Sequence, residues 1–290
     1  MGKDPNEIRR ILVDRLDVHG DVLVATSVLP GLARKYPNAS IDWHVRRGFD
    51  FALKNNPHIH RVIMGPRAPG YKDGYDLVVT PDHHYCWNRP MAQIHCDQAG
   101  VPLHKPELYF SKEELDAVPE RFRGRVLVTA YTAGWQSRTC PNLGKVLALL
   151  RENQHQMLQA DNGRPIADRI DHFPELKLRE IATIMHYAKL YIGIDTVFMH
   201  MAVACGVPMV LCMGPTDQRT QFIPNATVIK PFKHDNPAMG HKDFAHGIDI
   251  PLGIILTGIR TKLSSDGDIV DRVFKDDMIS YVSEEEYDIM

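Results

Sequence analysis

The segment "YIGIDTVFMHMAVACGVPMVLCMGPTD", residues 191–217, contains two apolar runs that each end in small, acidic or hydroxyl-bearing residues. The first run stops at Asp195 and Thr196, and the second stops at Gly214. Between them lies a stretch rich in Met, Ala and Cys that breaks at residues 206–208. This pattern predicts a strand, a helix and a second strand, with the polar residues brought together at the carboxyl edge of a parallel sheet.

The same alternation of strand-like and helix-like runs extends in both directions along the chain. Apolar runs are followed by segments with apolar residues at helical spacing, which is typical of parallel sheets covered by helices. The expected strands are residues 11–13, 41–45, 61–64 and 75–81, then 126–132, 155–159, 190–194 and 208–213. We therefore expect an α/β fold with two doubly wound, Rossmann-like halves.

A charged segment that contains both Pro and Gly, residues 112–124, separates the two halves. This composition is typical of a connection between domains. We expect an N-terminal domain at 1–118 and a C-terminal domain at 119–267. Residues 268–290 include apolar residues at helical spacing, and we expect them to form a C-terminal helix.

The composition limits the class of protein. Of the 290 residues 44% are hydrophobic, which is enough to build a core in each half. The formal net charge of -2 does not favour nucleic acid as a partner. The five cysteines lack C-x-x-C spacing, so we expect reduced thiols in an intracellular protein. No apolar run approaches the roughly 20 residues of a membrane span, so we expect at most peripheral contact with a membrane.

Ligands of doubly wound folds bind at the carboxyl ends of the strands, where helices begin. There Asp195 and Thr196 precede a helix whose first amide groups can bind an anion. Gly214, Pro215 and Thr216 offer a second turn with amide groups and a hydroxyl. A diphosphate fits two such turns better than a single carboxylate does. The alternative is that Asp195 caps the helix and that Gly214 belongs to an ordinary turn.

The first half has a comparable segment, "LDVHGDVLVATSVL", residues 16–29. Gly20 allows the backbone to approach a ligand closely, and Asp21 lies at the start of the expected helix. The Asp21 carboxylate can cap this helix, or it can accept a proton from a substrate hydroxyl. The segment lacks the G-x-G-x-x-G pattern, which argues against a dinucleotide-dependent oxidoreductase.

Three segments carry a family resemblance: "ILVDRLDVHGDVLVATSVLPGLARKYPNASIDWHV", "NNPHIHRVI" and "LKLREIATIMHYAKLYIGIDTVFMHMAVACGVPMVLCMGPTD". In their order and spacing they resemble glycosyltransferase family 9, the heptosyltransferases of lipopolysaccharide core synthesis. The resemblance implies a GT-B type fold, in which an N-terminal acceptor domain and a C-terminal donor domain face a cleft. It also implies that the C-terminal helix crosses back to the first domain.

The resemblance implies roles for individual residues. Asp21 matches the general base, and His19 and Gly20 lie beside it on the acceptor side. Arg138 is the nearest counterpart of a lysine that the family carries before a W-P pair. The implied donor-binding residues are Arg138, Asp195, Thr196, His200, Gly214, Pro215 and Thr216. For His200 the alternative is a structural role, in which it ties its helix to a neighbouring loop.

The implied activity is inverting transfer of a heptose-like sugar from a nucleoside-diphosphate sugar, ADP-linked, to a hydroxyl acceptor. The acceptor is a lipopolysaccharide core or another glycan or lipid-linked molecule. We expect no cofactor and no metal, and a cytoplasmic protein with or without contact with the inner membrane. Val197 stands where the family has a glycine. Two alternatives remain, a nucleotide-sugar binding protein without activity and a nucleotide-sugar epimerase.

Three further features leave alternatives open. Asp161 or Glu175 is a candidate for the acid that binds the donor ribose. Residues 83–96 form either the acceptor wall or the packed start of a helix. Residues 233–247 contain three histidines and two aspartates, which form either a metal site or, as their spacing favours, a solvated loop.

Overall fold

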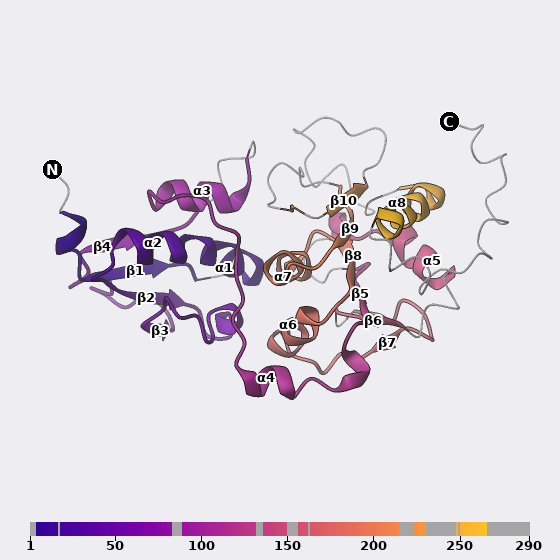
Figure 1. Ribbon diagram of the computed structural model, residues 1–290, viewed down its shortest axis with the longest axis horizontal. Coiled ribbons are helices and arrows are strands. Elements are labelled where there is room, and N and C mark those ends of the chain that lie inside the picture. Colours follow the sequence, from indigo (N-terminus) through magenta and orange to yellow (C-terminus); the bar gives the residue numbers. More distant parts are fainter. Residues whose placement is uncertain are drawn as a thin grey trace.

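The computed structural model describes residues 4–16, 18–82, 89–131, 136–149, 156–161, 163–214, 223, 224, 226–229, 248 and 250–265. Within these residues two parallel sheets lie next to each other, each with helices packed on it (Figure 1). The expected α/β fold with two parallel, helix-covered sheets is confirmed. Among the described helices none combines the length and the apolar character needed to span a bilayer.

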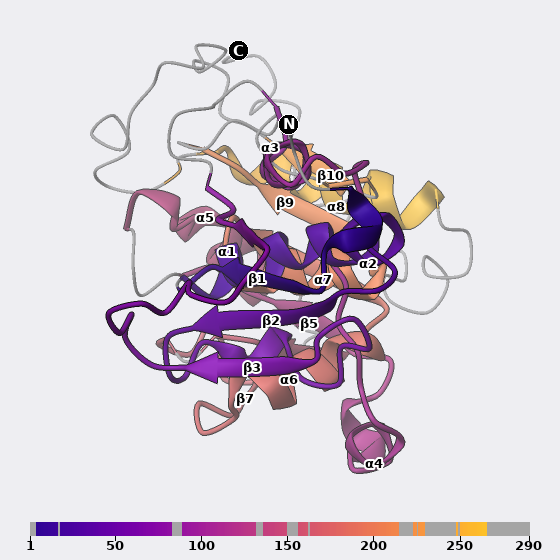
Figure 2. The same cartoon turned by 90° about the vertical axis from the view of Figure 1, so that its left-hand side faces the viewer.

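The first sheet has the strand order β3-β2-β1-β4, and all of its neighbouring strands run parallel. Its strands are β1 (Arg10–Asp14), β2 (Ser40–Val45), β3 (Arg61–Met64) and β4 (Leu77–Val79). Figure 2 shows β1, β2 and β3 side by side. The helices of this half are α1 (His19–Ala25), α2 (Leu29–Lys35) and α3 (Met91–Gln98), with the 3-10 helices η1 (Pro5–Glu7), η2 (Thr26–Val28) and η3 (Asp50–Ala52).

The central strand β1 contains a continuous apolar run because it is buried on both faces of the sheet, whereas the edge strands β3 and β4 are only partly buried. Ile11, Leu12 and Val13 of β1 are fully buried, and so is Trp43 of β2. The burial continues to the carboxyl end of β1, where Asp14 is a buried carboxylate. Polar side chains therefore collect at this edge of the sheet, where they must find partners within the protein.

The second sheet has the strand order β10-β9-β8-β5-β6-β7, again with all neighbouring strands parallel. Its strands are β5 (Val126–Val128), β6 (Met157–Gln159), β7 (Asp171–His172), β8 (Leu190–Ile194), β9 (Met209–Cys212) and β10 (Ala226–Ile229). Its helices are α5 (Pro141–Leu149), α6 (Leu178–His186), α7 (Val197–Cys205) and α8 (Leu252–Ser265), with the 3-10 helix η5 (Gln136–Arg138). One face packs on α6 and α7, and the other packs on α5 and α8.

The two sheets are joined through a shared apolar cluster. Leu23 of α1 and Phe51 of η3 belong to the same buried cluster as Met199 of α7. Between the sheets the chain passes through α4 (Lys112–Asp116) and the 3-10 helix η4 (Glu120–Phe122), as Figure 1 shows. The contact of α1 with α7 therefore brings the first helix of one half against the helix that follows Thr196 in the other.

Several elements differ from the expectations. The long helix expected from residue 22 onwards starts earlier, at His19, and is divided by η2, with Pro30 near the start of α2. The strands β7 and β10 and the helix α8 were not expected. The expected C-terminal helix at 268–290 lies outside the described residues.

Candidate functional site

Asp21 is the third residue of α1, and its side chain does not cap that helix. The residue before the helix is Val18, and no side-chain hydrogen bond caps this end. The Asp21 carboxylate instead accepts a hydrogen bond at Oδ2 from Nη2 of Arg15, which is a buried residue. The alternative in which Asp21 is a helix cap is therefore wrong, and its carboxylate belongs to a charged pair at the carboxyl end of β1.

His19 packs on aromatic residues of its own half, whereas Gly20 faces the second half. The His19 ring stacks on Phe49 with ring centroids 4.2 Å apart, and burial lowers the pKa of His19 against the opposing effect of Asp50. Gly20 faces α7: a methyl group built at Gly20 would lie 3.0 Å from Cδ2 of His200. The backbone of α1 can approach α7 this closely because residue 20 has no side chain.

His200 is buried, and its ring lies against Gly20 of the other half. This contact supports the structural alternative in a changed form, because His200 joins α7 to the first helix of the other half rather than to a neighbouring loop. Its expected role in donor binding stays a prediction.

On the second sheet Asp195 and Thr196 lie at the carboxyl end of β8. Thr196 precedes α7 with extended backbone, but no side-chain hydrogen bond caps the helix. Asp195 is 4% exposed, and its Oδ2 lies 3.5 Å from Nη1 of Arg138. This Oδ2 atom has no hydrogen-bond partner among the described residues. Capping by Asp195 is thus also wrong, and the carboxylate lies near Arg138, for which the family resemblance implies a donor-binding role.

Tyr191 belongs to β8, the strand that precedes Asp195, and it is fully buried. Its hydroxyl is 3.5 Å from Oγ1 of Thr196 and 3.4 Å from the carbonyl oxygen of Ile194. Burial raises the pKa of Tyr191, so the phenol stays protonated. The tyrosine therefore supports the turn after β8 from inside the sheet. Sequence reasoning missed it, because an aromatic residue in an apolar run is most simply interpreted as core.

Asp161 lies at the carboxyl end of β6. Its Oδ1 accepts hydrogen bonds from Nε2 of Gln159 and from the amide of Gly163, both at 2.9 Å. Its Oδ2 is buried without a hydrogen-bond partner among the described residues, and burial raises the pKa of the carboxyl. Glu175, the other candidate for ribose binding, is exposed in a turn after β7. Asp161 is thus buried and Glu175 is exposed, and the role of either residue in ribose binding stays a prediction.

Gly214 lies at the same edge of the second sheet as Asp195 and Thr196. In the parallel register Ile194 pairs with Cys212, so the residues that follow each strand emerge next to each other. The expected partners Pro215 and Thr216 lie outside the described residues. The described part of the site therefore contains the first turn and only the beginning of the second.

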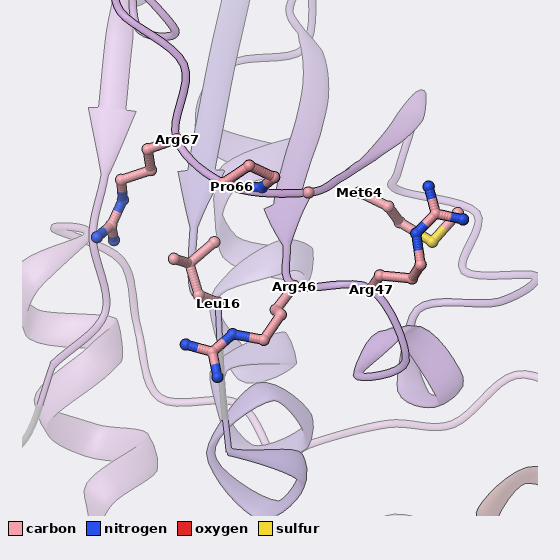
Figure 3. A pocket seen from close by; sticks show the side chains of 7 residues that line it. Leu16, Arg46, Arg47, Met64, Pro66 and Arg67 are labelled. Atoms are coloured by element: carbon pink, nitrogen blue, oxygen red, sulfur yellow. The ribbon is translucent and has the colours of Figure 1, made fainter.

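A pocket of about 480 Å³ opens at the carboxyl ends of β1, β2 and β3 (Figure 3). It is lined by Leu16, Arg46, Arg47, Met64, Gly65, Pro66 and Arg67. Arg67 donates from Nε to Asp14 Oδ2 at 3.1 Å, and Tyr71 donates to the same oxygen at 2.8 Å. The buried carboxylate of Asp14 thus holds one of the three arginines in place. The pair Arg46-Arg47 after an expected strand was a signal that sequence reasoning did not use.

No group of three or more His, Cys, Asp and Glu side chains that could hold a metal ion occurs within the described residues. The three histidines of residues 233–247 lie outside them, and so do residues 83–88 of the segment 83–96. In the described part of that segment Arg89 pairs with Asp97 at 2.5 Å, and the helix α3 begins at Met91.

Comparison with solved structures shows the fold. A family 9 glycosyltransferase from Veillonella parvula DSM 2008 matches with a TM-score of 0.70 and 14% identity, covering 91% of this chain and 99% of that one. The ADP-heptose lipopolysaccharide heptosyltransferase II of E. coli matches with a TM-score of 0.68 and 15% identity, covering 89% and 99%. The heptosyltransferase WaaC of E. coli with ADP gives 0.66 and 15%, covering 87% and 99%. The fold is therefore that of the GT-B glycosyltransferases.

The sequence model of glycosyltransferase family 9 (heptosyltransferase) matches residues 147–239. The resemblance drawn from the sequence is confirmed, since this range includes the third of the three segments that carry it, which extends from α6 past β9. No curated protein matches the chain.

Proposed function

We propose that this chain is an inverting glycosyltransferase that moves a heptose-like sugar from an ADP-linked donor to a hydroxyl of a glycan or lipid-linked acceptor. The observation that carries the proposal is the contact of α1 with α7. It places Gly20, next to the aspartate expected to be the base, against His200, one turn after the expected donor-binding Thr196. Two candidate half-sites from distant parts of the chain thus meet at one junction.

On the donor side the charges suit a diphosphate. When the bond between the anomeric carbon and the diphosphate breaks, negative charge grows on the leaving group, and groups already in place can stabilise it. Arg138 and the first amide groups of α7 are the positive groups of this edge. Asp195 and Asp161 each have a buried oxygen without a hydrogen-bond partner among the described residues, which suits hydroxyl groups of a sugar or ribose.

On the acceptor side Asp21 is the proposed base. It accepts the proton of the acceptor hydroxyl while the acceptor oxygen attacks the anomeric carbon from the face opposite the diphosphate. This single displacement inverts the anomeric configuration. The arginine pocket lies at the carboxyl ends of β1, β2 and β3. Its wall includes Leu16, which directly follows Arg15, the partner of Asp21. We propose that it binds an anionic group of the acceptor, because guanidinium groups pair with carboxylates and phosphates.

We propose that transfer proceeds without a metal ion, since Arg138 and backbone amides supply the positive charge. A protein of similar fold, TibC from enterotoxigenic E. coli H10407, is described as an iron-containing glycosyltransferase, so the point needs a direct test. Dialysis against EDTA is expected to leave the transfer rate unchanged. A loss of rate that is restored by one added metal ion would contradict this part of the proposal.

The decisive experiment has two steps. ADP-, UDP-, GDP- and dTDP-linked sugars are first compared by thermal shift, because a ligand at 100 times its Kd adds about 2.7 kcal/mol to stability. The best donor is then incubated with candidate acceptors, and the anomeric configuration of the product is determined by NMR. Transfer with inversion is expected. Retention, or release of an altered free sugar as an epimerase would give, contradicts the proposal.

The second candidate is a nucleotide-sugar binding protein without activity. The observation that favours it is Val197, whose Cα lies 3.9 Å from the position of a methyl group built at Gly20. A β-branched residue thus occupies the first position of α7, where the family has a glycine. Tight donor binding without turnover over the whole acceptor panel would support this candidate instead.

A further inference from the structure

We infer that Arg15 is the positioning residue of the base, holding the Asp21 carboxylate at the angle in which its second oxygen meets the acceptor hydroxyl. The inference rests on the proposed function. Arg15 directly follows β1, and its guanidinium contacts two other segments, the start of α1 and the chain that follows β4. Nη2 donates to Asp21 Oδ2, and Nη1 donates to the carbonyl oxygen of Pro81 at 2.9 Å and lies 3.9 Å from Oδ1 of Asp82.

The backbone of Arg15 is held by the first sheet. The Arg15 amide donates to the carbonyl oxygen of His44 at 3.2 Å, which continues the pairing of β1 with β2 by one residue. The Arg15 carbonyl accepts from Nε1 of the buried Trp43 at 3.3 Å. Groups held by packed strands are positioned more accurately than groups held by loops. Arg15 therefore connects the carboxyl end of β1, through its backbone, to Asp21 at the start of α1, through its side chain.

The pair with Arg15 uses one of the two carboxylate oxygens of Asp21. Only Oδ2 of Asp21 receives a hydrogen bond from the described residues, and the side chain is 18% exposed. Rotation of the carboxylate about its Cβ–Cγ bond would break the bond to Arg15, so the direction of Oδ1 is set. In the transfer step the acceptor proton passes to Oδ1, the acceptor oxygen forms the bond to the anomeric carbon, and the diphosphate leaves with the electron pair of the broken bond.

The competing explanation is that Arg15 only stabilises the fold. The chain offers a matched control, Arg125, which pairs with Asp171 at 2.9 Å and donates to the carbonyl of Met157. The side chains of Arg15 and Arg125 are 10% and 12% exposed, and the Nε atom of each is buried without a hydrogen-bond partner among the described residues. Arg125 immediately precedes β5, so it lies at the amino edge of its sheet, away from the candidate site.

The test measures kcat, donor affinity and unfolding for Arg15→Met, Arg15→Lys and Arg125→Met. Arg15→Met is expected to lower kcat on the order of 100-fold, because misplacing a reacting group by about 1 Å has this effect. Its donor Kd by calorimetry is expected to equal that of the wild type. Arg15→Lys retains the charge but loses the two-point fork, so an intermediate kcat is expected. Arg125→Met is expected to lower stability while kcat stays at the wild-type value.

Two further measurements separate positioning from folding. In an Asp21→Asn background Arg15→Met is expected to cause no additional loss of kcat, because residues that act as a unit are not additive. Added methylguanidinium is expected to restore part of the rate of Arg15→Ala. An unchanged kcat of Arg15→Met, or the same loss with and without Asp21, overturns the assignment. A wild-type protein that transfers no sugar overturns the proposed function itself, which is a distinguishable result.

Discussion

In each half an aspartate lies next to an arginine at the carboxyl edge of a parallel sheet. We call a pair closed when the two side chains are hydrogen-bonded to each other, and open when the facing carboxylate oxygen has no hydrogen-bond partner among the described residues. Arg15 and Asp21 form a direct hydrogen bond, and Arg15 is also bonded to Pro81. Arg138 and Asp195 are 3.5 Å apart, and the facing oxygen of Asp195 has no hydrogen-bond partner among the described residues. A closed pair holds a side chain in one orientation, whereas an open pair leaves polar atoms that a ligand can satisfy. The difference matches the proposed division of labour, a fixed base on one side and a ligand-filled site on the other.

The closed pair is tested most strongly by Asp21→Ala. Because the proposed base is removed, kcat is expected to fall on the order of 100- to 10,000-fold. The proposed donor site lies on the other half, so donor affinity by calorimetry is expected to remain that of the wild type. Turnover close to the wild-type rate would show that Asp21 has only a structural role.

The open pair is tested by Asp195→Asn, which retains the shape of the side chain but removes its charge. A buried hydrogen bond to a charged group contributes roughly 1.5 to 3 kcal/mol, so the donor Kd is expected to rise roughly 10- to 100-fold. Titration calorimetry with the preferred nucleotide sugar measures it. Asp171→Asn is the control, since Asp171 pairs with Arg125 away from the site. Equal donor affinity in both variants would remove Asp195 from the donor site.

A substitution in the arginine pocket tests the proposed acceptor binding of the first half. Arg47→Ala is expected to raise the acceptor KM roughly 10-fold with little change in kcat or donor Kd, because it removes one charge-assisted contact. The effect is expected to shrink at high salt, since exposed charges are screened. Arg169→Ala, an exposed arginine of the second half, serves as control. An acceptor KM that does not move would exclude the pocket from acceptor binding.

The arginine–carboxylate pair of Arg179 and Glu114 joins the halves, and its substitution is expected to give the smallest effect. Arg179 donates to both carboxylate oxygens of Glu114 at 2.9 and 2.7 Å and to the carbonyl oxygen of Phe51 at 3.0 Å. Glu114→Gln is expected to lower the free energy of unfolding by about 1 kcal/mol at pH 7, measured by denaturant unfolding. Turnover at 25 °C is expected to be unchanged. A large loss of kcat would mean that the pair acts on the site and not only on the junction.

The same pair gives a pH dependence. The Arg179 guanidinium lowers the pKa of Glu114 from its ordinary value of 4.5 to about 2. Below pH 4.5 the unfolded chain therefore binds a proton that the folded protein does not, so the contribution of Glu114 is complete above that pH and is lost toward pH 2. The wild type is expected to lose more stability than Glu114→Gln between pH 5 and pH 3. Parallel curves would contradict the assignment.

The strands of the sheets could be predicted where their apolar runs are long. The run at residues 190–194 coincides with β8, and the run at 208–213 contains β9. The strand β7 has two residues and β10 is only partly buried, so neither produces an apolar run distinct from a loop. Their positions depend on the neighbouring strands to which they are bonded.

The candidate site could be predicted as residues but not as contacts. Asp195 stands out because it follows an apolar run and Asp21 because it precedes one, yet capping was the simplest local explanation for both. It is wrong because each carboxylate has an arginine nearby, and Arg138 is far from Asp195 in the sequence. The pocket was missed for the same reason. Its lining comes from three strand ends that become neighbours only when the sheet forms.

Gly20 gives the junction a property that no charged residue provides. The space between α1 and the His200 ring is too small for a methyl group to enter without displacing the ring by a few tenths of an ångström. The two halves can approach this closely because residue 20 has no side chain. Any larger residue at this position would push α1 and α7 apart. The fit of one half on the other therefore limits which residues position 20 can hold, independently of the proposed activity.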